Sequence, residues 1–109
     1  MNVKITAQCT LAGFALVASM ITPVVAAEDG KALYTAKMCM TCHGDEGKAP
    51  IIPSYPKLNG QNKEYLVAQI KMIKDGTRTG GGTAAMKAMT ANLNDAEIEA
   101  ISEYLSTVE

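Results

Sequence analysis

Five consecutive residues, Cys39-Met40-Thr41-Cys42-His43, constrain this chain more than any other feature of its sequence. The spacing Cys-x-x-Cys-His is the attachment signature of a c-type haem. Each thiol can add across one vinyl group of the porphyrin, and two intervening residues let a single backbone turn reach both vinyl groups. The histidine that follows then lies beneath the iron as its proximal ligand. His43 is the only histidine in the sequence, so no other imidazole can take this role.

Three other uses of the motif fit the rest of the chain less well. A redox disulfide of the thioredoxin kind expects a βαβ pattern around the cysteines, and none is visible. A zinc site usually has four protein ligands, and only Cys39, Cys42 and His43 are at hand. A plain disulfide in an oxidising compartment is the third alternative. The preferred interpretation is one covalent haem c, joined through two thioethers to Cys39 and Cys42 and coordinated by His43.

The N-terminus has the three-part layout of a secretory signal peptide, which favours export to the periplasm. A single cation, Lys4, precedes an apolar run that ends in small residues. Cleavage is expected after Ala26 or Ala27, which gives a signal peptide at 1–26 and a cytochrome-sized domain at 27–109. An uncleaved membrane anchor is the alternative, but the polar interruptions of the run favour removal.

The mature chain of about 82 or 83 residues has few means of building a large core by itself. Cys9 is lost with the signal peptide, so no disulfide framework remains, and a covalent haem would supply the missing apolar centre. Without Lys4 the domain holds 9 Lys+Arg against 11 Asp+Glu, a net charge near −2. No basic cluster indicates binding to nucleic acid.

The residue pattern of the domain predicts three helices and no strand. They cover about 31–38, 63–75 and the C-terminal segment from 95 onward. The expected N-caps are Asp29, Asn62 and Asn94, the last in a capping box with Glu97, and Gly76 is expected to end the second helix. Between the helices, prolines at 50, 53 and 56 exclude a regular element. The apolar residues of that stretch are expected to cover the haem edge: Ile51, Ile52, Tyr55 and Leu58.

A haem with one histidine needs a sixth ligand or has an open coordination site. Met86 and Met89 are the best candidates, because both fall in an expected loop before the last helix that can fold across the other face of the ring. Met38 and Met40 sit at the attachment edge, and Met72 is expected to pack within a helix. Spacing alone leaves Met86 and Met89 both open.

From about residue 30 to 108 the chain resembles small class I bacterial cytochromes c, in particular the cytochrome c-553 group and the domains of dihaem cytochrome c4. The residues that carry the resemblance are Gly30-Lys31-Ala32-Leu33-Tyr34, Cys39-x-x-Cys42-His43-Gly44, Tyr55-Pro56-Lys57-Leu58-Asn59-Gly60-Gln61, Gly76-x-Arg78-Thr79 and Leu93-x-Asp95-x-x-Ile98. The resemblance implies an all-α cytochrome c fold, with three main helices and loops wrapped around one haem. It also implies that the first and last helices cross.

The resemblance further implies roles for three residues of the site. Met86, seven residues before the leucine that precedes the last helix, would be the sixth ligand. The carbonyl of Pro50 would accept the Nδ1–H of His43, and Arg78 would lie near a haem propionate.

Histidine–methionine ligation leaves no open coordination site and suits the transfer of single electrons. The sequence therefore predicts a periplasmic electron carrier rather than an enzyme, which docks with a donor and an acceptor at the exposed haem edge and has no catalytic residue. The alternative is the small cytochrome subunit of a larger oxidoreductase, such as a sulfide-oxidising flavocytochrome or a sulfur-oxidation complex. A haem with an open site that binds small ligands and a haem-free disulfide oxidoreductase are the other hypotheses.

Overall fold

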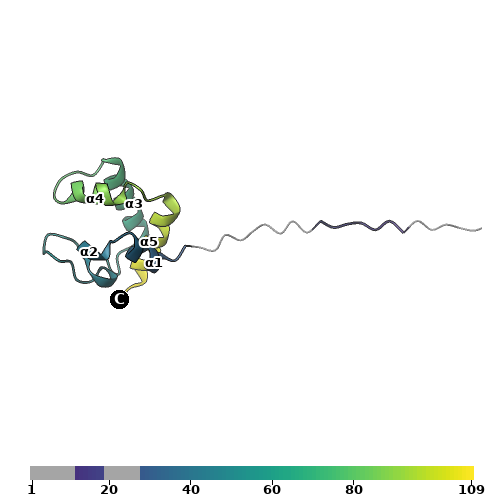
Figure 1. Cartoon of the computed structure of the whole chain (residues 1–109), viewed down its shortest axis with the longest axis horizontal. Coiled ribbons are helices and arrows are strands. Elements are labelled where there is room, and N and C mark those ends of the chain that lie inside the picture. Colours follow the sequence, from purple (N-terminus) through teal and green to yellow (C-terminus); the bar gives the residue numbers. More distant parts are fainter. Residues whose placement is uncertain (1–11, 19–27) are drawn as a thin grey trace, which may run out of the picture.

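The structure is a computed structural model that describes residues 12–18 and 28–109. Figure 1 shows the helices of residues 28–109 gathered in one body. The predicted signal peptide, apart from 12–18, and its cleavage point lie outside the described residues. Residues 12–18 form no regular element, and their large apolar side chains are exposed. Among the described residues, no helix has the length and apolar character needed to cross a membrane.

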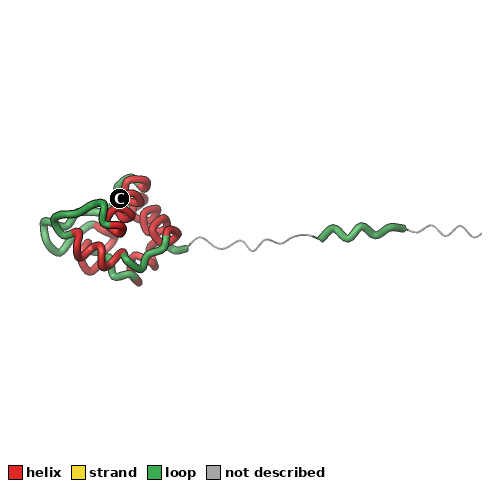
Figure 2. The backbone as a smooth tube through the Cα atoms, turned by 90° about the horizontal axis from the view of Figure 1, so that it is seen from above, coloured by secondary structure: helices red, strands yellow, loops and turns green. Residues whose placement is uncertain are grey.

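The part at 28–109 consists of helices and loops, and no strand occurs in the described residues, which confirms the all-α prediction. The elements in chain order are α1 (Gly30–Ala36), α2 (Met40–His43), the 3-10 helix η1 (Asp45–Gly47), α3 (Lys63–Asp75), α4 (Thr83–Thr90) and α5 (Asp95–Thr107). The three predicted helices correspond to α1, α3 and α5. Figure 2 shows long loops alternating with these helices around the body.

The segment that carries Met86 and Met89 is helical, and the prediction of a loop there was wrong. Its run of alanine, lysine and methionine consists of good helix formers. Gly82 starts α4 without a side-chain cap. The Thr90 hydroxyl donates to the carbonyl oxygen of Met86 at 2.9 Å inside the helix. The two methionines are therefore held one helical turn apart on a regular element.

The predicted helix ends are confirmed. Asp29 accepts from two amides of the first turn of α1, and Asn62 accepts from the amide of Tyr65. Asn94 and Glu97 form the capping box of α5, and the Asn94 amide holds the pKa of the Glu97 carboxyl below its usual value. Gly76 ends α3 in the left-handed conformation, with φ of 85°.

The core forms where α1 and α3 pack against α5. Its buried cluster consists of Tyr34, Leu66, Leu93, Ile98, Ile101 and Leu105. Helices α1 and α5 come unusually close at Gly30, where an added Cβ would lie 2.0 Å from the carbonyl oxygen of Ala100. One turn later the rings of Tyr34 and Tyr104 meet with their centroids 5.9 Å apart. The expected crossing of the first and last helices is thus present. It fixes the position of α1, and the Cys-x-x-Cys-His segment begins just after the C-terminal end of this helix.

Candidate haem site

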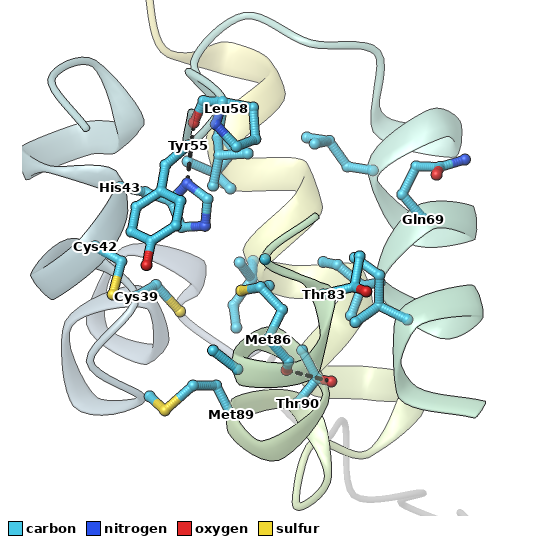
Figure 3. Close-up of a pocket in the computed structure, with 18 of the residues that line it drawn as sticks. Cys39, Cys42, His43, Tyr55, Leu58, Gln69, Thr83, Met86, Met89 and Thr90 are labelled. Atoms are coloured by element: carbon cyan, nitrogen blue, oxygen red, sulfur yellow. Dashed lines mark hydrogen bonds between the residues drawn. The ribbon is translucent and has the colours of Figure 1, made fainter. Parts of the chain in front are cut away.

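A cavity of about 310 Å³ opens between the Cys-x-x-Cys-His segment, the loop after η1, and helices α3 and α4. Its walls are mainly apolar and include Leu66 and Ile70 of α3 and Ile101 and Leu105 of α5. Figure 3 shows Cys39, Cys42 and His43 on one flank of this cavity and Met86 on the flank formed by α4. The three motif residues and Met86 therefore share one apolar enclosure.

A tight turn at the end of α1 places the motif beside the cavity. The amide of Met38 donates to the carbonyl of Thr35 at 3.0 Å, and the amide of Cys39 donates to the carbonyl of Tyr34 at 3.1 Å. This pair of bonds is a Schellman turn, and its left-handed position is filled by Met38, with φ of 61°. The single turn of α2 follows and puts Cys39 and Cys42 three residues apart on one helical face.

Both thiols are free and half-buried. Burial raises the pKa of the Cys39 thiol above its usual value. The two sulfurs lie in the same cavity as the imidazole, which is the arrangement that two thioether bonds to one ring require.

His43 is 4% exposed, and one of its ring nitrogens has a backbone partner. Nδ1 lies 3.0 Å from the carbonyl oxygen of Pro56. Because a carbonyl only accepts, Nδ1 is the donor in this contact, and in the neutral imidazole the lone pair then lies on Nε2. In Figure 3 this second nitrogen is on the cavity side of the ring. An imidazole held in this way is suited to bind a metal through Nε2.

The expectation that Pro50 accepts this hydrogen bond was wrong. The chain just after Pro50 is tied to the backbone of the motif instead, because the Ile51 amide donates to the carbonyl of Cys42 at 3.0 Å. Pro56 reaches the ring because the Leu58 amide donates to Gly47 at 2.9 Å and brings the following stretch alongside it. Leu58 also packs against the core two residues after Pro56, which anchors this stretch beside the ring.

The two candidate methionines differ in where they point. Met86 is half-buried, and Figure 3 shows its side chain directed into the cavity toward the flank of His43. Met89 is 47% exposed and extends past Cys39 at the lower edge of the view, away from His43. Met72, expected to pack within its helix, does not line the cavity. The orientation favours Met86 over Met89 as the residue that faces the imidazole.

Arg78 lies at the edge of the cavity and is exposed. Its Nη1 donates to the side-chain oxygen of Gln69 at 2.8 Å, and its amide donates to the carbonyl of Met72 at 2.9 Å. These bonds attach the guanidinium to α3 at the entrance, where it can meet an anionic group on a bound molecule.

The proline-rich loop covers the cavity only in part. Tyr55 and Leu58 line it, and the ring centroid of Tyr55 lies 6.2 Å from that of His43. Ile51 is 64% exposed, and neither it nor Ile52 contributes to the lining. The expectation that all four apolar residues cover the site was therefore wrong for the two isoleucines, because the backbone bond of Ile51 to Cys42 holds this turn outside the cavity.

The residues present fit a covalently attached, flat apolar macrocycle with a central metal. They offer two thiols for attachment, an imidazole whose Nε2 is on the cavity side, a facing thioether, apolar walls and the cations Lys37 and Arg78. The hydrogen bond from Nδ1 to Pro56 is of the kind that orients the ring of a metal-binding histidine.

Comparison with known proteins gives consistent matches. A family model described as cytochrome c matches residues 27–109. Cytochrome c-554(548) of Halomonas halodenitrificans is 42% identical over 71 residues, which cover 65% of this chain and 84% of that protein. The thiosulfate dehydrogenase electron acceptor of Thiomonas intermedia is 35% identical over 68 residues, which cover 62% of this chain and 31% of that protein.

Among solved structures, reduced recombinant cytochrome c4 from Pseudomonas stutzeri aligns with a TM-score of 0.63 and 28% identity. The alignment covers 73% of this chain and 46% of that one, so this chain spans about half of the length of that relative.

Proposed function

Because the chain belongs to the cytochrome c family, whose members bind haem c covalently, we propose that it is a periplasmic carrier of single electrons with one histidine–methionine-ligated haem. The observation that supports this most strongly is the shared cavity, in which the buried imidazole of His43 and the thioether of Met86 face each other across an apolar space. Cys39 and Cys42 would form the two thioether bonds.

When bound, the haem supplies an iron that gains or loses one electron. The chain supplies what makes this exchange easy. Pro56 holds the proton on Nδ1 of His43, which fixes the ring plane and makes Nε2 a better donor. The apolar walls would keep water away from the bound group, and His43 and Met86 would both hold its iron, which would leave no site for a substrate. Arg78, attached to Gln69 at the rim, would balance the charge of a propionate.

Export follows from the same proposal. Cytochromes c of bacteria carry their haem outside the cytoplasm, and the layout of residues 1–26, with cleavage after Ala26 or Ala27, would direct the chain to the periplasm. In that compartment the domain would meet a donor and an acceptor protein in turn.

The ligand assignment is tested by two matched substitutions on the same helix. Met86→Ala is expected to abolish the weak red absorption of methionine bound to ferric iron, and to let the reduced protein bind carbon monoxide at neutral pH. Met89→Ala is expected to retain the red band and to exclude carbon monoxide, because its side chain extends away from His43. The reverse pattern would assign the ligand to Met89.

A second candidate function is that of a dedicated cytochrome partner or small subunit of a larger oxidoreductase. It is favoured by the similarity to the thiosulfate dehydrogenase electron acceptor of Thiomonas intermedia. Size-exclusion chromatography of the native protein separates the two functions. A free carrier elutes at the size of one domain, whereas a subunit elutes with a lasting partner.

A further inference from the structure

Tyr34 contacts both ends of the Cys-x-x-Cys-His segment, and we propose that it is the positioning residue that sets the orientation of His43. Its carbonyl oxygen accepts the amide of Cys39 at 3.1 Å, where the segment begins. Its hydroxyl donates to the carbonyl oxygen of Gly44 at 2.7 Å, directly after the segment ends. One side chain and its own backbone thus bracket the five residues of the motif. This inference rests on the proposed role of His43 as an axial ligand.

Tyr34 can act as a fixed reference because it belongs to the core. Its side chain is 2% exposed and packs in the cluster shared by α1, α3 and α5. The ring of Tyr104 lies at a centroid distance of 5.9 Å and a tilt of 58°. Burial raises the pKa of the Tyr34 hydroxyl to about 12, so the hydroxyl remains protonated and able to donate throughout the physiological pH range. The Tyr34 side chain is therefore held rigidly, and its hydroxyl remains a hydrogen-bond donor.

Tyr34 contacts the backbone next to the histidine at Gly44. Its backbone has φ of 79° and ψ of 172°, a conformation that favours glycine. An added Cβ would lie 2.1 Å from the carbonyl oxygen of Ala49, so the loop after the motif passes immediately beside it. The Gly44 amide donates to the carbonyl of Met40 at 2.9 Å, and its carbonyl accepts the amide of Gly47 at 3.1 Å, so local backbone bonds hold this turn. The hydroxyl of Tyr34 is the bond that ties the same carbonyl to the core, and with it the direction in which the backbone leaves His43.

The imidazole is then restrained from two independent directions. Pro56 holds Nδ1 from the side of the ring, and Tyr34 holds the backbone that follows the same residue. Loss of the second restraint leaves the hydrogen bond to Pro56 in place but lets the ring plane rotate about it. The expected consequence is a change in the electronic signature of the axial ligand rather than loss of the haem.

Tyr34→Phe removes the hydroxyl and keeps the ring in the core, and Tyr104→Phe is the matched control. Within the described residues the Tyr104 hydroxyl makes no hydrogen bond, although its ring lies beside that of Tyr34. Two measurements on the haem-loaded proteins are compared. The first is the set of hyperfine-shifted haem methyl resonances of the oxidised form, which depends on the orientation of the imidazole plane. The second is amide hydrogen exchange in the reduced form.

In Tyr34→Phe we expect altered methyl shifts and exchange of the His43 and Gly47 amides that is about fivefold faster, the equivalent of one lost hydrogen bond. In Tyr104→Phe both readouts are expected to stay at wild-type values. Methyl shifts that are unchanged in Tyr34→Phe overturn the proposal, even if the melting temperature falls, because the hydroxyl would then be purely structural.

The same experiment separates this proposal from the proposed function. A wild-type protein without histidine–methionine haem signals refutes the proposed function and, with it, the assignment of His43 as the ligand that Tyr34 orients. Wild-type signals of the expected kind with identical methyl shifts in both variants refute the role of Tyr34 alone.

Discussion

Substitution of Gly30 by alanine tests how closely the first and last helices must approach. The added Cβ would lie 2.0 Å from the carbonyl oxygen of Ala100 and 2.7 Å from the Cβ of Tyr104. Ordinary contacts begin near 3.4 Å, so the helices would have to separate by roughly 1.4 Å at this point. Neither obstacle is the far end of a flexible side chain, and the clash cannot be relieved by a rotamer change.

The expected loss in the free energy of unfolding can be estimated from two opposing contributions. Forcing extra volume into a well-packed interface usually costs about 1–3 kcal/mol. Alanine in place of glycine stabilises a helix by up to about 1 kcal/mol, and by less at the first helical position, which Gly30 occupies. The net loss is therefore about 1.5 kcal/mol, which for a domain of this size corresponds to a fall in melting temperature of roughly 6–12 °C.

Thermal unfolding of the reduced, haem-loaded protein measures this loss. Lys31→Ala introduces the same residue at the next position of α1, where the side chain is exposed, and is expected to change the free energy of unfolding by less than about 0.5 kcal/mol. A Gly30→Ala variant as stable as Lys31→Ala would show that the close packing of α1 and α5 is not required, and would refute the reasoning.

Two further predictions concern the backbone and the pH dependence. Met38→Gly is expected to stabilise the domain by about 0.5–1 kcal/mol in chemical denaturation, because Met38 holds φ of 61° in the Schellman turn and glycine adopts this conformation without strain. Met40→Gly, within α2, is the control and should destabilise the domain. A loss of stability in both variants would contradict the strain argument. The free energy of unfolding of the reduced protein is expected to fall by about 2 kcal/mol as pH rises from 10 to 12, since the unfolded chain releases the Tyr34 proton near pH 10 and the folded protein retains it to about 12. Denaturant titrations at several pH values should show this decline in the wild type and a smaller one in Tyr34→Phe, and parallel curves would contradict it.

Local rules made much of the fold predictable. The caps at Asp29, Asn62 and Asn94 and the left-handed end at Gly76 are short-range features that depend on residues within one turn, and each is present as expected. The motif likewise indicates its own chemistry, because five consecutive residues set the spacing of its thiols and imidazole.

The features that sequence did not predict depend on contacts between distant segments. The choice of Pro56 over Pro50 follows from the backbone bond of Leu58 to Gly47, which only the folded chain brings together. The residues at 83–90 are good helix formers, but the glycines before them favoured a loop, and the packing against α3 that supports this helix exists only in the folded chain. The hydroxyl of Tyr34 gave no signal, because a tyrosine and a phenylalanine are equally acceptable in a buried helical stripe.

The mass of the exported protein tests the central claim most directly. The protein should be purified from the periplasm of a host with intact machinery for cytochrome c maturation and measured under denaturing conditions. The account predicts the mass of a chain that begins at residue 27 or 28 plus one haem, with the added mass confined to the peptide that contains Cys39 and Cys42. A mass equal to that of the bare polypeptide would contradict it.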